Sequence, residues 1–296
     1  MPPVTLSLLG SIDRSGLRAV VQSYIDQTNG DWPAEVIVDF SRLTFIRPLG
    51  VTFLSNFFDW LLGHKIQVKL VGLEKYTAPL SYLDDSLFFE RYLGRKLHPH
   101  SSPRVTTMPL ISVAHQNSHE WLRNTMMPWL AARLGASRAS LYPFQNCISE
   151  IFNNTKDHST KDIASIFAQH FPNENIVRIA IADFGVGIPA TARRIDKNLS
   201  DNAAIERAVR RGFTAKTTAG NQGIGLDDLM NSVVTINKGR VDILSLNGHV
   251  SFYSMGTGVA AQPLVSRGYC PGTTIDISLR TDTIEHVDEE PEELRW

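Results

Sequence analysis

Residues 1–96 alternate strand-length runs of apolar and β-branched residues with amphipathic stretches of helical length. We expect strands and helices in turn at Val4–Leu9, Ser15–Gln27, Glu35–Phe40, Leu49–Leu62, Ile66–Val71 and Tyr76–Phe89. Parallel neighbouring strands need long crossover connections, which are usually helices. The alternation therefore predicts an α/β fold, with helices packed against a mainly parallel sheet.

The composition excludes several other classes. Hydrophobic residues make up 43% and charged residues 20% of the 296 positions, as in ordinary globular domains. The two cysteines, Cys147 and Cys270, lie far apart, which fits a reducing compartment and argues against a zinc site. No apolar run reaches the roughly 18 residues of a membrane span, and no signal-peptide pattern opens the chain. We expect a cytoplasmic protein that contacts no membrane.

Charge and length bound the partners and the domain count. Lys and Arg number 29 against 30 Asp and Glu, so the net charge of -1 disfavours nucleic acid as a partner. The segment 97–112 is rich in Pro, Ser and Thr and is typical of a linker. We expect a first domain at 1–96, that linker, a second domain at 113–281 and an acidic tail at 282–296.

A motif in the first part marks a particular α/β module. Asp39 and Ser41 follow a strand, and Gly50 stands near the start of an apolar helix. The stretch EVIVDFSRLTFIRPLGVTFLSNFF resembles the STAS domain, the fold of anti-sigma-factor antagonists. Phosphorylatable members place a serine just before that glycine, where this chain has Pro48 and Leu49. The resemblance implies a STAS-like domain without that phosphorylation switch; another small α/β module is the alternative.

The second part begins with two expected helices, Ala114–Leu134 and about 139–158. In the second helix Glu150, Asn154 and His158 are spaced four residues apart, so they share one helical face. A carboxylate and an amide one turn apart suit a site where magnesium bridges water and phosphate. Taken alone, these residues are better explained as a solvated helix face.

A hairpin then leads into a glycine motif. Ile163–Phe171 and Ile176–Ala182 are expected strands, and the second ends in Asp183 followed by Gly185 and Gly187. The glycines let the backbone pass close to a bound ring or phosphate. The aspartate can accept a hydrogen bond from an exocyclic amine such as adenine N6.

The same glycines also spell G-x-G-x-x-A with Ala190, the weaker form of a dinucleotide-binding fingerprint. That motif needs a second strand ending in an acidic residue roughly 20 residues later. The following stretch, ATARRIDKNLSDNAAIERAVRRG, is polar and contains no strand pattern. We therefore reject a Rossmann-type site.

A second glycine cluster follows. Gly220, Gly223 and Gly225 lead into a helix expected from Leu226, and Lys216 precedes them. A glycine loop entering a helix favours anion binding, because free N–H groups and the positive end of the helix dipole meet there. The lysine adds a charge for a phosphate. A surface loop would account for a glycine cluster that stood alone.

The order of these motifs resembles the GHKL (Bergerat-fold) ATP-binding family, which includes histidine kinases, anti-sigma-factor kinases, gyrase, MutL and Hsp90. The resemblance implies ATP and Mg²⁺ as ligands of an α/β sandwich, a mixed sheet covered on one face by helices. It implies that Glu150 activates water or a hydroxyl and that Asn154 binds magnesium. It implies further nucleotide contacts from Asp183, Gly185, Gly187, Lys216, Gly223, Gly225 and Leu226.

The remaining sequence fits that fold. Arg240–Leu246 and His249–Ser254 flank Asn247-Gly248, a signal for a type I′ hairpin turn. Gly272–Leu279 predicts a last strand. The segment 188–222 is as long as functional loops are, and we expect a helix at Asn202–Arg211 within it.

Three functions stay open. The first is a kinase-like switch of the anti-sigma-factor-kinase type, acting on a protein client or regulator through the STAS-like domain. The second is an ATP-hydrolysing dimerisation clamp resembling MutL or Hsp90, and the third is ATP sensing without turnover. A sensor histidine kinase is disfavoured, because too few residues separate His119 from Glu150 for a dimerisation hairpin.

Overall fold

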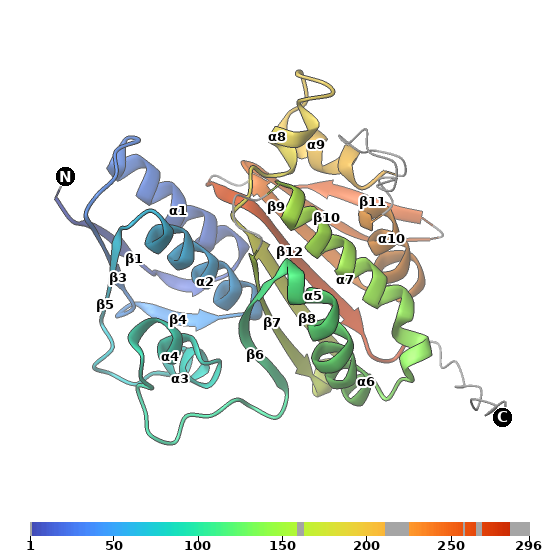
Figure 1. Cartoon of the computed structure of the whole chain (residues 1–296), viewed down its shortest axis with the longest axis horizontal. Coiled ribbons are helices and arrows are strands. Elements are labelled where there is room, and N and C mark those ends of the chain that lie inside the picture. The colour runs from blue at the N-terminus through green and yellow to red at the C-terminus, as the bar shows by residue number, and fades with distance from the viewer. Residues whose placement is uncertain (1, 159–162, 211–224, 257, 265–267, 285–296) are drawn as a thin grey trace.

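The structure is a computed structural model that describes residues 2–158, 163–210, 225–256, 258–264 and 268–284, with the backbone alone for 154–158 and 163–164. Figure 1 shows the course of the chain. The strands are β1 (Val4–Ser7), β2 (Gly10–Ile12), β3 (Glu35–Asp39), β4 (Leu43–Ile46), β5 (Gln67–Val71), β6 (Thr107–Ala114), β7 (Ile163–Phe171), β8 (Ile176–Asp183), β9 (Arg240–Leu246), β10 (Gly248–Met255), β11 (Gly258–Pro263) and β12 (Cys270–Arg280). The α-helices are α1 (Arg14–Thr28), α2 (Pro48–Gly63), α3 (Ala78–Asp85), α4 (Phe88–Leu93), α5 (His115–Trp121), α6 (Met127–Leu134), α7 (Arg138–His158), α8 (Ile188–Ala192), α9 (Asp201–Ala208) and α10 (Gly225–Leu229).

The N-terminal part is the expected parallel α/β layer. Strands β1, β3 and β5 pair in parallel in the order β1-β3-β5, and β2 pairs in parallel with β4. Asp13 caps α1 by accepting hydrogen bonds from the backbone N–H groups of Ser15 and Gly16. The single helix expected at 76–89 is two helices, because Leu87 adopts a left-handed backbone conformation (φ +69°) between α3 and α4.

The second part is built on one seven-stranded sheet in the order β11-β10-β9-β12-β8-β7-β6. Every pairing among its described strands is antiparallel, while the parallel pairs lie in the N-terminal sheets. The α/β class is confirmed, with the two kinds of pairing in separate sheets where one mixed sheet was expected. Short connections join β7 to β8, β9 to β10 and β10 to β11, and only antiparallel neighbours can be joined in that way.

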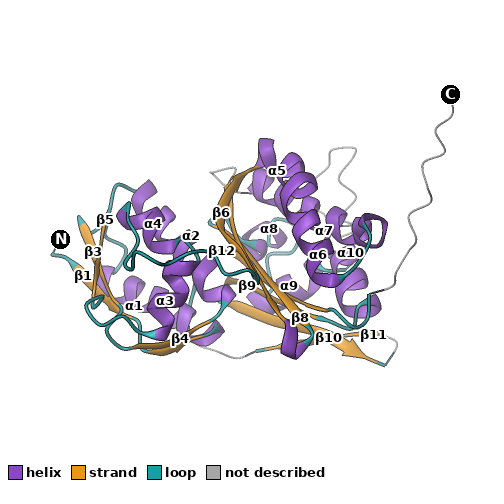
Figure 2. Cartoon of the chain, turned by 90° about the horizontal axis from the view of Figure 1, so that it is seen from below, coloured by secondary structure: helices purple, strands orange, loops and turns teal. Residues whose placement is uncertain are grey.

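Helices cover one face of this sheet. Figure 2 shows α5, α6, α7 and α10 on one side of it. The helix expected at 114–134 is α5 and α6 joined by the π-helical segment η1 (Leu122–Met126). Pro128, at the start of α6, lacks a backbone N–H, so the regular hydrogen-bond ladder is interrupted there. A second π-helical segment, η3 (Met230–Ile236), continues α10. None of the described helices combines the length and apolar character needed to cross a membrane.

The N-terminal part packs on the other face of the same sheet. Ile179 and Ile181 of β8 join the core beneath the helices, whereas Ala180 between them joins the core of the N-terminal part. Helix α2 lies against β7 and β8, and the Thr52 hydroxyl is within 3.4 Å of the carbonyl oxygen of Ala180. The alternating side chains of one strand therefore serve two cores.

The segment expected to be a linker contains part of the sheet. Strand β6 occupies 107–114 and pairs with β7 as the edge strand. Its register shifts between Met108 and Ile111, around Pro109. Proline is accommodated at such an irregularity on an edge strand, and it masked the strand pattern in the sequence. The domain boundaries themselves stay a prediction.

The hairpin expected near Asn247-Gly248 is present, but its turn differs. Gly248 pairs with Ser245, so the two-residue loop is Leu246–Asn247, and only Leu246 has a positive φ (+52°). A type I′ turn requires positive φ at both loop residues. Gly248 is needed for close packing instead, because a Cβ there would lie 2.6 Å from Cδ1 of Ile205 in α9.

Candidate functional site

The helix that carries Glu150 and the start of the helix after the second glycine cluster meet directly. Glu150 lies on α7, and Gly225 begins α10. A Cβ on Gly225 would lie 2.5 Å from Cβ of Glu150, so no larger residue fits without movement. Leu226 is partly buried against the core beneath α7 and α10. Lys216 and Gly223, and the side chain of Asn154, lie outside what the structure describes.

A polar chain holds the Glu150 carboxylate. The Asn153 side-chain amide donates to Glu150 Oε1 at 3.3 Å, and Nε2 of His115 lies 3.0 Å from Asn153 Oδ1. Because an amide oxygen only accepts, the imidazole is the donor in that second contact. His115 begins α5, so the orientation of Glu150 is set from a second helix. Nothing in the sequence pattern singles out Asn153 and His115, because their roles depend on how α5 packs against α7.

Asp183 stands at the end of β8. Its Oδ1 accepts a hydrogen bond from the backbone N–H of Gly185 at 2.7 Å, which turns the chain sharply after the strand. Thr273 of β12 is its cross-strand neighbour, and the backbone of Thr273 also donates to this carboxylate. Burial outweighs both hydrogen bonds and raises the pKa of Asp183 to about 6. A carboxylate held in such surroundings is a candidate for ligand recognition.

The loop after Asp183 is fixed from below by β9 and β12. Gly187 has a φ of +81°, and a Cβ there would lie 2.8 Å from the Ser245 hydroxyl oxygen. That hydroxyl donates to the carbonyl oxygen of Gly272 at 2.6 Å and accepts from the Ile188 N–H at 3.0 Å. Gly272 (φ +68°) lies so close to the end of β8 that a Cβ on it would be 2.1 Å from the Asp183 carbonyl oxygen. Both glycines are therefore required by close approach and by positive φ.

Ser245, Gly272 and Thr273 support this loop, and none of the three was predicted as a site residue from the sequence. The Gly-Thr-Thr run at the start of the last strand was the available signal. It could be recognised only with the knowledge that β12 lies beside β8.

One aromatic residue of the loop touches the N-terminal part. The Phe184 ring stacks near Trp60 of α2, with 5.8 Å between ring centroids and 21° between ring planes. Phe57 of the same helix lies 6.5 Å from Phe184 by the same measure. The loop that carries Asp183 is therefore in contact with both parts of the molecule.

The segment after this loop is anchored to the β9–β10 hairpin. The expected helix is present as α9, and its Ser200 cap accepts from the Ala203 N–H. The backbone N–H of Asn247 donates to Asp201 Oδ2 at 2.8 Å, and that of His249 donates to Asn202 Oδ1 at 2.8 Å. Residues 211–224, where the lysine and most of the glycine cluster fall, lie outside the described part.

The residues of the STAS-like motif form a local turn. Asp39 accepts from the backbone N–H of Ser41 at 2.8 Å. Pro48 opens α2, and a Cβ on Gly50 would lie 2.6 Å from the Ile46 side chain. The glycine thus lets α2 approach β4, and the resemblance to a STAS domain stays a prediction.

The arrangement brings together groups that could contact a polar ligand. The Asp183 carboxylate can accept a hydrogen bond from an amine. A Cβ on Gly187 or on Gly225 would collide with neighbouring atoms of the protein. Glu150 offers a carboxylate held by a neighbouring amide. Among the described residues no group of three or more His, Cys, Asp or Glu side chains is placed to hold a metal ion, and the expected magnesium ligand Asn154 has no described side chain.

The comparisons with known proteins identify no family. No family model matches the sequence, and no curated protein matches it. Among solved structures, the B-subunit of the DNA gyrase from Myxococcus xanthus overlaps at 9% identity and a TM-score of 0.28, covering 58% of this chain and 46% of that chain. The chain thus spans less than half of that subunit's length. A TM-score this low does not define a common fold, so the class stated here, an α/β protein, rests on the strands, helices and contacts above.

Proposed function

We propose that this protein is an ATP-binding regulator of the GHKL type. The observation that carries the proposal is the junction of Glu150 and Gly225, which brings two motifs from distant parts of the sequence to within van der Waals contact. The Asp183 carboxylate, with its loop held by Ser245 and Gly272, supports an adenine site at the end of β8. Figure 1 shows α7 crossing the sheet toward the end at which β8 leads into α8.

Each residue has a role within this proposal. Asp183 would accept a hydrogen bond from the adenine amine, and Asn154 would hold Mg²⁺ through its amide oxygen. ATP supplies a phosphoryl group whose transfer is favourable. Glu150 would take the proton from the attacking hydroxyl or water, with Asn153 and His115 keeping its carboxylate oriented.

Among the open functions, we favour a kinase-like switch that acts on a partner protein. The contact between Phe184 and Trp60 supports this proposal, because a conformational change in the loop after Asp183 would alter a contact with the N-terminal part. We infer that the N-terminal part, as a STAS-like module, presents the surface for the client. Pro48 and Leu49 carry no hydroxyl, so phosphorylation would occur on another chain.

Product analysis tests this proposal. The full chain is incubated with γ-labelled ATP and candidate partners, and phosphoprotein is separated from free phosphate. Label on a partner supports the switch, whereas free phosphate with ATP-dependent dimerisation supports the clamp alternative. Glu150→Gln should abolish either product, and Glu120→Gln, on an exposed position of α5, should change neither. Failure of the chain to bind or turn over ATP at all would overturn the proposal.

A further inference from the structure

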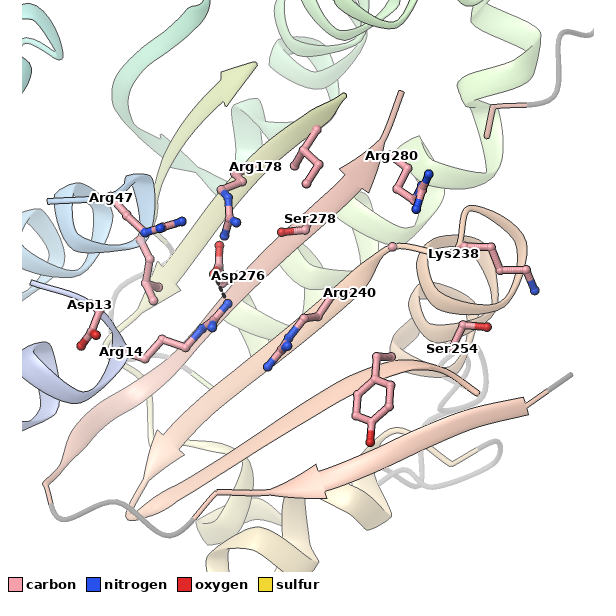
Figure 3. A pocket seen from close by; sticks show the side chains of 14 residues that line it. Asp13, Arg14, Arg47, Arg178, Lys238, Arg240, Ser254, Asp276, Ser278 and Arg280 are labelled. Atoms are coloured by element: carbon pink, nitrogen blue, oxygen red, sulfur yellow. Dashed lines mark hydrogen bonds and ion pairs between the residues drawn. The ribbon is translucent and has the colours of Figure 1, made fainter. Parts of the chain in front are cut away.

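A basic groove lies on the face of the sheet opposite the helices. It has a volume of about 590 Å³ and is bounded by the start of α1, the start of α2 and the open surface of β8, β12, β9 and β10. Figure 3 shows its labelled side chains extending from these elements. The groove is thus separated from the proposed ATP site by the thickness of the sheet.

Cations dominate the lining. Six basic side chains line the groove against two carboxylates, those of Asp13 and Asp276. The basic residues are Arg14, Arg47, Arg178, Lys238, Arg240 and Arg280. Asp13 already caps α1, and Asp276 is paired with Arg14 at 2.8 Å. The chain as a whole carries a net charge of -1, so this concentration of positive charge is local.

Half of these cations have no anionic partner within the described part of the chain. Arg14 and Arg240 share Asp242, and Arg280 pairs with Asp282. No ion pair is formed there by the other three, which are Arg47, Arg178 and Lys238.

Arg178 is the most constrained of the three. It is partly buried, and its Nε is enclosed without a hydrogen-bond acceptor. Its guanidinium lies over the Phe171 ring, with 6.0 Å between the guanidinium carbon and the ring centroid. Burial lowers the pKa of Arg178, the Asp276 carboxylate opposes that shift, and the nearby charges of Arg47 and Arg14 add to it. The enclosed Nε–H of Arg178 has no acceptor in the protein, so an anion in the groove could supply one.

The register of the strands spaces the charges. Arg178, Ser278, Arg240 and Tyr253 form one row across β8, β12, β9 and β10. Arg178 and Arg240 are therefore two strands apart, roughly 10 Å between backbones. At this spacing a ligand with two phosphate groups can place one phosphate beside each arginine. The Ser278 hydroxyl between them can donate to the same ligand.

The groove suits a small ligand better than a nucleic-acid strand. Its volume lies within the range of roughly 300–1,000 Å³ found for small-molecule sites. A single-strand groove places several aromatic rings for successive bases, whereas Tyr253 is the one aromatic residue in this lining. Balanced overall charge adds no long-range attraction for a polyanion.

We propose that this groove is a second ligand site, which binds a small anion carrying two or more phosphate groups. Arg178 and Arg240 hold separate phosphates, and Lys238 and Arg47 supply charge at the rim. The site is independent of the proposed ATP site, since it uses the opposite face of the sheet.

Calorimetric titration of the full chain with inorganic tripolyphosphate tests the proposal. We expect saturable binding that persists when the chain is saturated with a non-hydrolysable ATP analogue. Arg178→Gln should weaken the binding by about tenfold or more, since a charge-assisted contact is lost. Lys238→Gln, at an exposed position, should weaken it by about threefold without affecting folding. Arg95→Gln, on the exposed surface after α4, should leave it unchanged.

Three results would overturn the proposal. The first is absence of tripolyphosphate binding by the folded wild-type chain. The second is binding that the ATP analogue abolishes and that both groove variants retain, which would assign it to the nucleotide site. The third is tighter binding of a single-stranded oligonucleotide that depends on Arg178, which would make the groove a nucleic-acid surface. Because the first titration needs no ATP binding, failure of the ATP proposal would leave its outcome interpretable.

Discussion

Asp183 links stability to ligand recognition at the scale of a single residue. Its folded-state pKa of about 6 lies above the unfolded value of about 3.9. The folded chain therefore holds this proton more tightly than the unfolded chain does. The associated stability is present in full below about pH 4 and is lost as the pH rises through about 6. At neutral pH the protein retains an ionised carboxylate at a cost to its stability.

Asp183→Asn should remove that cost. The amide keeps an oxygen that can accept from Gly185, so we expect the variant to be more stable than wild type by about 1–2 kcal/mol near pH 7.5. The gap should narrow toward about pH 4, where the wild-type carboxyl is neutral. Urea unfolding at both pH values measures it. A variant less stable than wild type by the same amount at both pH values would contradict this account.

Both cysteines should be unreactive in the folded chain. Burial raises the pKa of Cys147 to about 11 and that of Cys270 to about 12. The thiolate is the reactive form, so little of it exists at about pH 8. A thiol reagent should modify neither residue until the chain is unfolded by denaturant. Rapid modification of one thiol per native chain would contradict the described burial.

Several residues of the site could be predicted as candidates, because their motifs are local in sequence. Glu150, Asp183 and the glycines after it stand at short fixed spacings. Asn153, His115 and Ser245 could not be predicted, since their contacts join elements that only the tertiary structure brings together. The local pattern suggested candidate residues, and the tertiary packing supplied the groups that contact them.

At the scale of elements, the junction of α7 with α10 is the closest described contact between two helices of the proposed site. Gly225→Ala should force the two helices apart, because the new Cβ would lie 2.5 Å from Cβ of Glu150. We expect a loss of about 1–3 kcal/mol in stability and weaker ATP binding. Gly258→Ala is the matched control, since a Cβ there would meet no atom within 4 Å. Thermal unfolding and nucleotide titration of both variants measure the effect, and equal behaviour of the two would contradict it.

The elements also show where local patterns mislead. Strand β6 was hidden by Pro109, and the hairpin glycine Gly248 serves packing under α9 where a turn conformation was expected. In both cases the usual conformational preference of the residue led to a wrong expectation, because a contact with a neighbouring element determines the role of that residue in the fold. Strand β3, helix α2 and strand β7 lie within one residue of their expected bounds, whereas β2, β4 and β11 were not expected from the sequence.

At the scale of the whole molecule, the N-terminal part packs on one face of the seven-stranded sheet, and buried polar contacts cross this interface. Arg18 of α1 is fully buried and donates to the carbonyl oxygens of Asn247 and Gly268 at 2.6 and 2.7 Å. Arg14 pairs with Asp242 and Asp276, whose side chains are 1% and 4% exposed. Removing the N-terminal part would take the Arg14 partner from the buried Asp276 carboxylate and the Arg18 donor from both carbonyl oxygens.

The chain should therefore unfold in one cooperative transition. Calorimetry of the full chain should give a single peak, with equal calorimetric and van't Hoff enthalpies. A fragment of residues 113–281 should aggregate, because it lacks most of β6 and exposes the apolar face that α2 covers. Two separate transitions, or a folded and soluble fragment, would show that the parts are independent.

Adenine recognition by Asp183 is the feature of the proposed site that one measurement tests most directly. Titration of the full chain with Mg²⁺ and non-hydrolysable analogues of ATP and GTP measures it. We predict saturable binding of the ATP analogue, at least about tenfold tighter than the GTP analogue, because guanine presents a carbonyl where adenine presents an amine. Asp183→Asn should reduce that preference. Equal affinity for both nucleotides, or no binding of either by the folded chain, would contradict the proposed recognition of adenine by Asp183.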